Sequence, residues 1–369
     1  GKRSNDYTGL GDWVANKERL PFGIKGLADR IEEMGMKFGL WFEPEMVNKD
    51  SDLYRAHPDW ILHAPQRASC HGRNQYVLDF SRKEVVDCIY DMMYKILSES
   101  KISYIKWDMN RSITECYSVA LPADRQGEVF HRYILGVYNL YDRLTTAFPQ
   151  ILFESCASGG GRFDPGMLYY APQGWISDDT DAAERVRIQY GTSMCYPISS
   201  MGSHVSVVPN HQLNRITSLH TRANVAYFGT FGYELDLNKL TDEEIAEVKA
   251  QIVFMKEYRE LIQFGNFYRL KSPFDGNETV WMTVSEDKRK ALVFWYRERN
   301  VVNAEFTRVR LQGLDPDLIY KNEYNGTENY GDELMNLGLL TTDVTAGEPT
   351  NEDLPCTDYE SRIYVLTAE

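Results

Sequence analysis

From Leu27 to Gly265, amphipathic helical windows alternate with short apolar runs. In one such window, residues 83–98, the apolar positions recur at the spacing of a single helix face: Val86, Ile89, Tyr90, Met93 and Ile96. Alternation of helices with short buried strands is typical of repeated βα units on a parallel sheet. The pattern therefore predicts an α/β domain over residues 1–265.

Seven apolar runs are expected to form strands: residues 37–42, 75–78, 104–107, 151–154, 173–176, 198–201 and 233–235. Helical windows separate them at residues 26–34, 83–98, 128–147, 182–192, 213–226 and 241–261. A closed (β/α)8 barrel of the TIM type requires eight parallel strands. The expected fold class is therefore an α/β TIM-type barrel whose first strand would precede Gly1.

After Gly265 the pattern changes to short β-prone runs separated by Gly, Asp and Asn turns. These runs cover residues 278–284, 291–296, 306–311, 318–323 and 361–366. Closely spaced strands of this kind are typical of antiparallel sheets. We expect residues 266–369 to form a small antiparallel β-sandwich that packs on the barrel.

The expected strand at residues 104–107 ends in a carboxylate, Asp108. Lys106 precedes Asp108 by two positions, so both side chains point to the same face of an extended chain. A cation beside a carboxylate keeps it ionised, as a nucleophile must be. A structural Lys–Asp pair at a sheet edge is the alternative. Trp107 points the other way and is expected to pack under the helices.

The run at residues 173–176 ends in Ser177 and a cluster of three carboxylates: Asp178, Asp179 and Asp181. Like charges in a partly buried cleft raise the pKa of at least one carboxyl group, which suits a general acid. Two alternatives are that Ser177 or Asp179 caps the following helix, and that the cluster binds a hard cation. Arg185 and Arg187 could neutralise some of this charge, which weakens the alternative of a metal site.

Catalytic groups of α/β barrels lie at the carboxyl ends of the strands. Two carboxylates at one barrel mouth indicate cleavage of a glycosidic bond.

Three consecutive glycines at residues 159–161 let the backbone approach a ligand closely, although a flexible turn is the alternative. Trp41 either stacks on a sugar ring or belongs to the core. Cys156 has no His near it in sequence and is not expected to be a nucleophile, and His204 is expected to be structural.

Composition narrows the possible partners. A formal charge of −14 gives no basic face for a nucleic acid, and an aromatic content of 13% suits stacking on sugars. The six cysteines are scattered without CxxC pairs, which argues against zinc or a disulfide scaffold and favours the reducing cytoplasm. No apolar run approaches the ~20 residues that a membrane helix needs, and the polar N-terminus does not resemble a secretory signal.

Four segments, residues 41–46, 106–111, 153–164 and 175–193, closely resemble motifs of the α-galactosidases of glycoside hydrolase family 36, in the family's order. The resemblance covers essentially the whole chain. It implies a (β/α)8 barrel with a C-terminal β-sandwich. It also implies a hydrolase that releases terminal α-linked galactose from raffinose- or melibiose-type oligosaccharides with retention of configuration.

The resemblance further implies residue roles. By the match to the family's Lys-Trp-Asp motif, Asp108 is the nucleophile. By the match to the Ser-Asp-Asp motif, Asp178 is the acid/base. Six positions match those that line the galactose subsite: Trp41, Arg73, Lys106, Cys156, Gly159 and Trp175. Neither a metal nor a cofactor is implied, and the full-length family enzymes are often homo-oligomers.

One departure from the family pattern matters. The Asp-Asp-Gly-Trp-Phe motif of the first barrel strand, which grips the galactose hydroxyls, is absent from this sequence, as is the family's N-terminal β-domain. We therefore expect the chain to be the C-terminal portion of a longer enzyme, and to be poorly active or unstable alone. The alternatives are a transgalactosylase or an α-N-acetylgalactosaminidase of the same fold, and a carbohydrate-binding fragment without catalysis.

Overall fold

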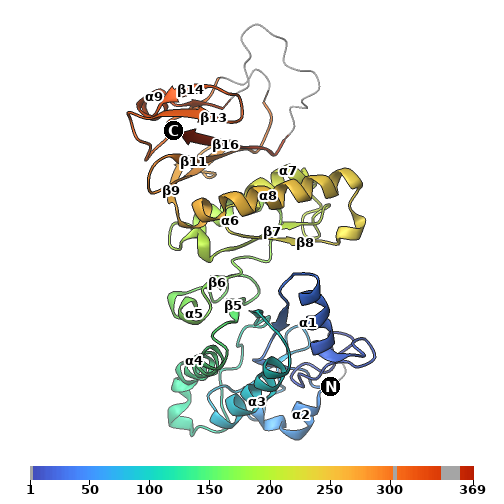
Figure 1. The fold of residues 1–369 in the computed structure, drawn as a ribbon. Coiled ribbons are helices and arrows are strands. Elements are labelled where there is room, and N and C mark those ends of the chain that lie inside the picture. Colours follow the sequence, from blue (N-terminus) through green and yellow to red (C-terminus); the bar gives the residue numbers. More distant parts are fainter. Residues whose placement is uncertain (1–2, 302–305, 342–357) are drawn as a thin grey trace. The chain divides into compact units, whose positions relative to one another are not determined.

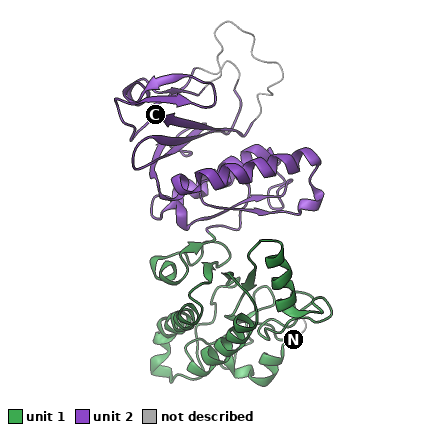
Figure 2. Cartoon of the chain, viewed as in Figure 1, with its two compact units in different colours: residues 1–175 green, residues 176–369 purple. Residues whose placement is uncertain are grey.

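The structure is a computed structural model that describes residues 3–301, 306–341 and 358–369 (Figure 1). Its contacts divide the chain into two compact units, Gly1–Trp175 and Ile176–Glu369 (Figure 2). Each unit is described by itself below. The predicted domain boundary at Gly265 is of a different kind, because it separates the expected barrel from the expected sandwich, and it stays a prediction.

The first unit is built on a parallel sheet with the strand order β1-β4-β5-β6. The strands are β1 (Gly39–Phe42), β4 (Tyr104–Trp107), β5 (Leu152–Ser155) and β6 (Gln173–Gly174). The helices are α1 (Gly23–Glu33), α2 (Asp52–Ala56), α3 (Lys83–Glu99), α4 (Val129–Ala147) and α5 (Pro165–Tyr170), with short 3-10 helices η1 (Pro58–Trp60) and η2 (Ala123–Glu128). This succession confirms the predicted βα pattern.

The register of the sheet places one polar row across four strands. Trp41 pairs with Lys106, Lys106 with Glu154, and Glu154 with Gln173. Register neighbours in a sheet project from the same face, and the next residue along each strand projects from the other. On that opposite face Trp107 is fully buried and stacks on Tyr141 of α4, with ring centroids 3.9 Å apart. The prediction that Trp107 packs under the helices is confirmed.

The expected strand at residues 75–78 is not part of the parallel sheet. It forms β3 (Tyr76–Val77), which pairs antiparallel with β2 (Met46–Val47) in a separate two-stranded sheet. A short apolar run has the same sequence signature in parallel and antiparallel pairing. Here the segment that follows β1 supplies its partner, with the Leu78 amide donating to the Glu45 carbonyl at 2.9 Å. The count of seven parallel strands was therefore wrong, and the described residues contain six.

In the second unit, β7 (Gly202–Ser206) and β8 (Thr230–Glu234) pair in parallel. The helices are α6 (Ala182–Thr192), α7 (Leu219–Ala226) and α8 (Asp242–Phe264), with short 3-10 helices η3 (Ile198–Ser200) and η4 (Leu237–Lys239). The strand predicted at residues 198–201 is thus the 3-10 helix η3, and the observed strand β7 begins immediately after it in the chain, at Gly202.

A six-stranded antiparallel sheet follows, in the order β14-β13-β16-β11-β10-β9. Its strands are β9 (Asn266–Lys271), β10 (Glu278–Val284), β11 (Lys290–Arg297), β13 (Ile319–Asn322), β14 (Glu328–Tyr330) and β16 (Glu360–Ala368). A smaller ribbon of β12 (Arg308–Val309) and β15 (Leu339–Leu340), together with α9 (Gly331–Asn336), completes this region. Alternate residues such as Val280, Met282 and Trp295 share one buried core with Val309 and Leu339. Two packed β layers confirm the predicted β-sandwich.

A fully buried carboxylate, Glu45, joins the end of β1 to three other parts of the first unit. It accepts hydrogen bonds from Trp107 Nε1 at 2.8 Å and Tyr133 OH at 2.5 Å. Both terminal nitrogens of Arg162 donate to it, at 2.8 and 2.7 Å. Burial alone would raise the pKa of Glu45, but the charge and hydrogen bonds of Arg162, with those of Tyr133 and Trp107, outweigh it and hold the pKa below its usual value.

We predict that Arg162→Met destabilises the protein by about 3–5 kcal/mol near pH 7, because it leaves Glu45 buried as an unpaired charge. The paired carboxylate contributes stability above its unfolded pKa of about 4.5 and loses it as the pH falls through the lower folded value. The deficit of the variant should therefore shrink in acid. Urea unfolding of the wild type and the variant, followed by circular dichroism near pH 7 and in acid, measures this difference in stability. Lys25→Gln, which breaks the exposed Lys25–Asp29 pair, is the control and should change nothing measurable.

Two helical glycines should respond oppositely to alanine. A Cβ on Gly136 of α4 would lie 1.9 Å from the carbonyl oxygen of Phe80, whereas a Cβ on Gly191 of α6 meets nothing within 4 Å. Gly136→Ala should cost about 3 kcal/mol by overpacking, and Gly191→Ala should gain about 0.5–1 kcal/mol from reduced backbone entropy of the unfolded chain. Thermal unfolding of both variants checks the pair, and a stable Gly136→Ala protein would contradict the close approach of α4.

Candidate active site

Asp108 lies directly after β4 and is 7% exposed. Three N–H groups donate to its carboxylate. Met109 N donates to Oδ1 at 2.8 Å, while Trp41 Nε1 at 3.1 Å and Asn110 Nδ2 at 2.6 Å donate to Oδ2. Donors of this kind fix the orientation of a carboxylate. The arrangement suits a carboxylate that acts as an oriented anion.

Trp41 contributes to this arrangement from β1 and is 40% exposed. It is therefore not the core tryptophan that sequence analysis left as an alternative. Its indole edge is engaged with Asp108, and much of its remaining surface is open. An exposed ring beside an oriented carboxylate can make apolar contact with the flat face of a bound sugar.

Lys106 projects from the polar row of the sheet, with its Nζ 3.2 Å from Glu154 Oε1. The same ammonium lies 4.5 Å from the centre of the Trp175 ring. Glu154 is 1% exposed, and its other oxygen accepts hydrogen bonds from Tyr104 OH and, at 2.6 Å, from Gln173 Nε2. A buried carboxylate and an aromatic face thus hold the Lys106 cation in place.

The glycine-rich loop after β5 begins with Cys156, whose N–H donates to the Trp107 carbonyl at 2.7 Å. The Ala157 amide then donates to the Gly159 carbonyl at 2.8 Å, with Gly159 at φ +81°, where glycine is favoured. Burial and then the charge of Asp108 raise the pKa of the Cys156 thiol. The thiol therefore stays protonated near neutral pH, in keeping with the prediction that it is not a nucleophile.

Arg73 is exposed and adopts a positive φ of 50°. Two hydrogen bonds tie its loop to the rest of the first unit. Arg111 donates to the Cys70 carbonyl at 2.6 Å, and Asn48 donates to the Asn74 carbonyl at 2.8 Å. The structure thus brings Trp41, Asp108 and Cys156 together and Lys106 onto Trp175. It fixes the loop of Arg73 without showing a contact of its side chain with the others.

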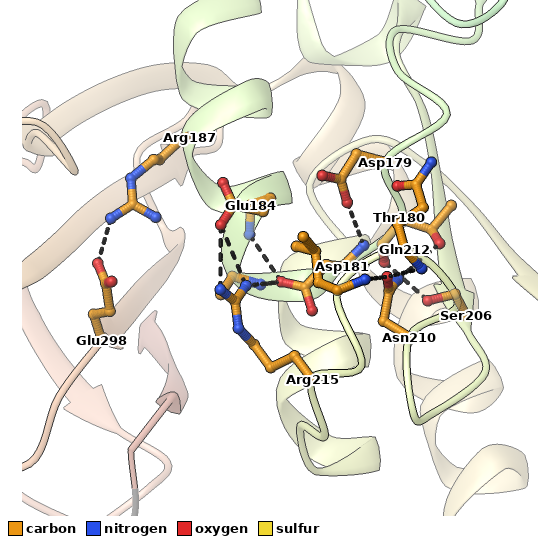
Figure 3. Close-up of polar contacts among 12 residues, drawn as sticks. Asp179, Thr180, Asp181, Glu184, Arg187, Ser206, Asn210, Gln212, Arg215 and Glu298 are labelled. Carbon is orange, nitrogen blue, oxygen red and sulfur yellow. Dashed lines mark hydrogen bonds and ion pairs between the residues drawn. The ribbon is translucent and has the colours of Figure 1, made fainter.

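Asp179 and Asp181 lie just before α6, the first helix of the second unit (Figure 3). Asp181 is the N-cap of α6, because its Oδ1 accepts from Ala183 N at 3.0 Å and Glu184 N at 3.2 Å. Asp179 Oδ1 accepts from Asp181 N at 3.0 Å. The helix is therefore capped by Asp181, and the alternative that Ser177 or Asp179 is its cap is wrong.

The arginines that contact the acidic cluster at residues 178–181 are only partly those expected from the sequence. Arg215 pairs with Asp181 and lies 3.3 Å from Glu184 (Figure 3). Arg187 pairs with Glu298, which follows β11, so its predicted role beside the cluster is wrong. Arg185 is buried and donates to the Ser177 carbonyl at 3.2 Å. Burial lowers the pKa of Arg185 to about 10, against the opposing charge of Asp179.

Asp178 is the exposed member of the cluster, whereas Asp179 is half-buried and Asp181 is buried. The other two carboxylates accept hydrogen bonds from the backbone that starts α6. A carboxyl group that is accessible on a loop fixed by its neighbours suits proton transfer to a bound molecule. The role of Asp178 as acid/base stays a prediction, and its exposure is compatible with that role.

His204 lies on β7, with its Nδ1 3.3 Å from Glu234 Oε2 of β8. This contact agrees with the structural role expected for it.

Among residues 3–301, 306–341 and 358–369, no group of three or more His, Cys, Asp or Glu side chains is placed to hold a metal ion. No helix in that part of the chain combines the length and apolar character needed to cross a bilayer. The cysteines in it are all unpaired, and Cys356 lies outside the described residues.

Sequence analysis missed the partners of the candidate residues. Glu154 and Gln173 support Lys106 through the register of three strands, and Asn110 orients Asp108 from two positions beyond it. Arg215, which pairs with Asp181, lies 34 residues along the chain. The signal for Glu154 was its place at the end of an apolar strand, since a charged residue there must find a partner. No sequence signal distinguishes Arg215 from other arginines.

Comparisons with known proteins identify the family. Residues 1–265 match the Melibiase family, and residues 278–366 match the Glycosyl hydrolase family 36 C-terminal domain. Alpha-galactosidase AgaA of Geobacillus stearothermophilus is 55% identical over 92% of this chain and 46% of that protein. Alpha-galactosidase Mel36A of Lactobacillus acidophilus is 52% identical over the same shares. The chain spans about half the length of the curated relatives it matches.

Solved structures agree with this similarity. The crystal structure of AgaA has a TM-score of 0.94 and 51% identity, covering 100% of this chain and 50% of that one. Variants of AgaA have been solved in complex with raffinose and with stachyose, with the same TM-score, identity and coverage. These relatives have the TIM-barrel fold, and the fold class predicted from the sequence is confirmed. The chain belongs to the melibiase family and carries the C-terminal domain of glycosyl hydrolase family 36.

Proposed function

We propose that the protein containing this chain is an α-galactosidase that releases terminal α-linked galactose from raffinose- and melibiose-type oligosaccharides. The observation that carries this proposal is the Asp108 carboxylate, held at a strand end by Trp41, Met109 and Asn110 in a chain 55% identical to AgaA. Complexes of AgaA variants with raffinose and stachyose support this class of substrate.

The proposed reaction is a double displacement with retention of configuration. Asp108 attacks the anomeric carbon while Asp178 gives its proton to the leaving oxygen, so a galactosyl ester forms on Asp108 and the aglycone departs. Asp178, now charged, takes a proton from water, which attacks the same carbon and releases Asp108. The transition states resemble an oxocarbenium ion, and the oriented negative charge of Asp108 stabilises them more than it stabilises the substrate.

The proposed galactose subsite consists of Trp41, Arg73, Lys106, Cys156, Gly159 and Trp175. The cation of Lys106 and the guanidinium of Arg73 can donate to sugar hydroxyls, and the rings of Trp41 and Trp175 offer apolar faces. Gly159 lets the loop backbone approach the sugar. Cys156, with its thiol protonated, offers a small surface beside Asp108.

The cytoplasmic location and the homo-oligomeric state expected from the sequence remain part of this proposal. Fractionation of cells, and light scattering of the purified full-length protein, would test them separately from the activity.

We predict that Asp108→Gly in the full-length protein lowers kcat for 4-nitrophenyl α-galactoside by a factor of at least about 10⁴, because the covalent step loses its nucleophile. Added azide should occupy the vacated space and restore turnover, with β-galactosyl azide as product. Release of 4-nitrophenol and product NMR measure both effects. An α-configured azide, or unchanged activity, would contradict the assignment of Asp108.

Asp178→Gly should give a different signature. With 4-nitrophenol as leaving group the first step needs little acid assistance, so we expect the galactosyl ester to accumulate and a burst to appear. Azide should then attack the ester and give α-galactosyl azide. Hydrolysis of raffinose, whose leaving group needs a proton, should fall by a further factor of about 10²–10⁴. Asp179→Asn is the matched control, and equal losses in the two variants would count against Asp178.

A further inference from the structure

A second carboxylate, Glu43, lies beside Asp108 and is not used by the proposed reaction. It follows β1 and is 1% exposed. Its Oε1 accepts from the backbone N–H of Asn110 at 2.8 Å, and its Oε2 accepts from Gln75 Nε2 at 2.8 Å. Asn110 in turn donates from Nδ2 to Asp108 at 2.6 Å. Glu43 therefore fixes the backbone of the residue whose side chain orients Asp108.

The charged groups near Glu43 act on its ionisation in opposite directions. Asp108 opposes its ionisation, and the more distant Arg3, whose guanidinium donates to Asn48 at 2.9 Å, favours it. Glu43 accepts hydrogen bonds from two amide groups, and within the described part of the chain no ion pair with it is found. Burial, together with the charge of Asp108 and against the hydrogen bonds of Asn110, raises the pKa of Glu43 to about 7. A carboxyl group in this setting changes its charge near neutral pH.

Gln75 is suited to both protonation states of Glu43. Its Oε1 is buried and is among the side-chain atoms of the described residues for which no hydrogen-bond partner is found. As oriented, Gln75 donates to a charged Glu43. A half-turn of the amide would present Oε1 to Glu43, which could then donate a proton of its own. The same neighbour thus satisfies the charged and the neutral carboxyl group.

We propose that Glu43 is a positioning residue for Asp108, which holds Asn110 in place and binds a proton while Asp108 is charged and releases it when the charge of Asp108 is neutralised. This inference rests on the proposed function for its kinetic consequence only. Formation of the galactosyl ester removes the charge of Asp108, the proton of Glu43 passes to water, and Gln75 turns to donate. Hydrolysis of the ester restores the Asp108 carboxylate, and Glu43 takes a proton back.

The effect on rate follows from the charges. An ionised Glu43 repels the charged Asp108, and ester formation relieves that repulsion, so ionisation of Glu43 accelerates the first step and slows the second. By linkage, each unit by which neutral Asp108 lowers the pKa of Glu43 corresponds to a tenfold change in the equilibrium for ester formation. Glu43→Gln should behave at all pH values as neutral Glu43 does.

The first test is a titration that needs no activity. The side-chain carboxyl carbons of glutamate are labelled with ¹³C in the full-length protein and followed by NMR from about pH 5 to 9. We expect one signal to titrate near pH 7, to vanish in Glu43→Gln, to remain in the control Glu84→Gln, and to move to lower pH in Asp108→Asn. A Glu43 signal that titrates only below about pH 5, or that does not move in Asp108→Asn, overturns the proposal.

The second test measures the first chemical step, as the release of 4-nitrophenol in a single turnover with enzyme in excess, in the wild type and in Glu43→Gln. The ratio of the wild-type rate to the variant rate should rise severalfold as the pH passes through about 7, whereas loss of Asn110 positioning alone would lower the variant equally at every pH. A ratio independent of pH overturns the coupling. If no α-galactoside is hydrolysed, the proposed function fails, and the titration still decides whether the charge of Asp108 controls protonation of Glu43.

Discussion

The carboxylate of Glu45 is the contact on which the arrangement of the first unit depends. It receives hydrogen bonds from β4 through Trp107, from α4 through Tyr133 and from the glycine-rich loop through Arg162. Each donor has given up water, and each would be costly to bury without its acceptor. Because Trp107 precedes Asp108 and Arg162 closes the loop that begins at Cys156, one buried anion fixes both the candidate nucleophile and the loop beside it. The hydrogen bonds of Glu45 thus set the geometry of the candidate site.

The register of the parallel sheet determines which side chains lie on each of its two faces. Parallel strands in register place Trp41, Lys106, Glu154 and Gln173 in one row, and the alternation of side chains leaves the other face to Ile105, Trp107 and Phe153, all of which are buried. Helix packing on that face therefore holds the strands, and the polar row lies on the other face. The same row buries the carboxylate of Glu154, which is unfavourable unless that carboxylate has hydrogen-bond and charge partners. Lys106, Tyr104 and Gln173 supply them and are themselves oriented by it.

Local signals in the sequence were sufficient for some of these features and not for others. The helix at residues 182–192 was predicted with the bounds it has. Asp108 and Asp178 were singled out as candidates because strand ends followed by acids can be read from neighbouring residues. The antiparallel pairing of β3 could not be found this way, since it depends on which segment lies alongside. The cap by Asp181 was missed because three acids within four residues satisfy the same rule, and only the turn geometry selects one.

Glu43 and Glu45 show why the chemistry of such residues cannot be read from the sequence. They lie two positions apart, both are almost fully buried, and burial raises the pKa of each. For Glu45 the opposing cation is Arg162, 117 residues away in the chain, and its pKa ends below the usual value. Glu43 has amide donors and the like charge of Asp108, and its pKa ends near 7. Since the desolvation cost has the same sign in both, the partner alone decides which carboxylate is a permanent anchor and which can exchange a proton. That partner is set by tertiary structure, so two glutamates of one motif take on different roles.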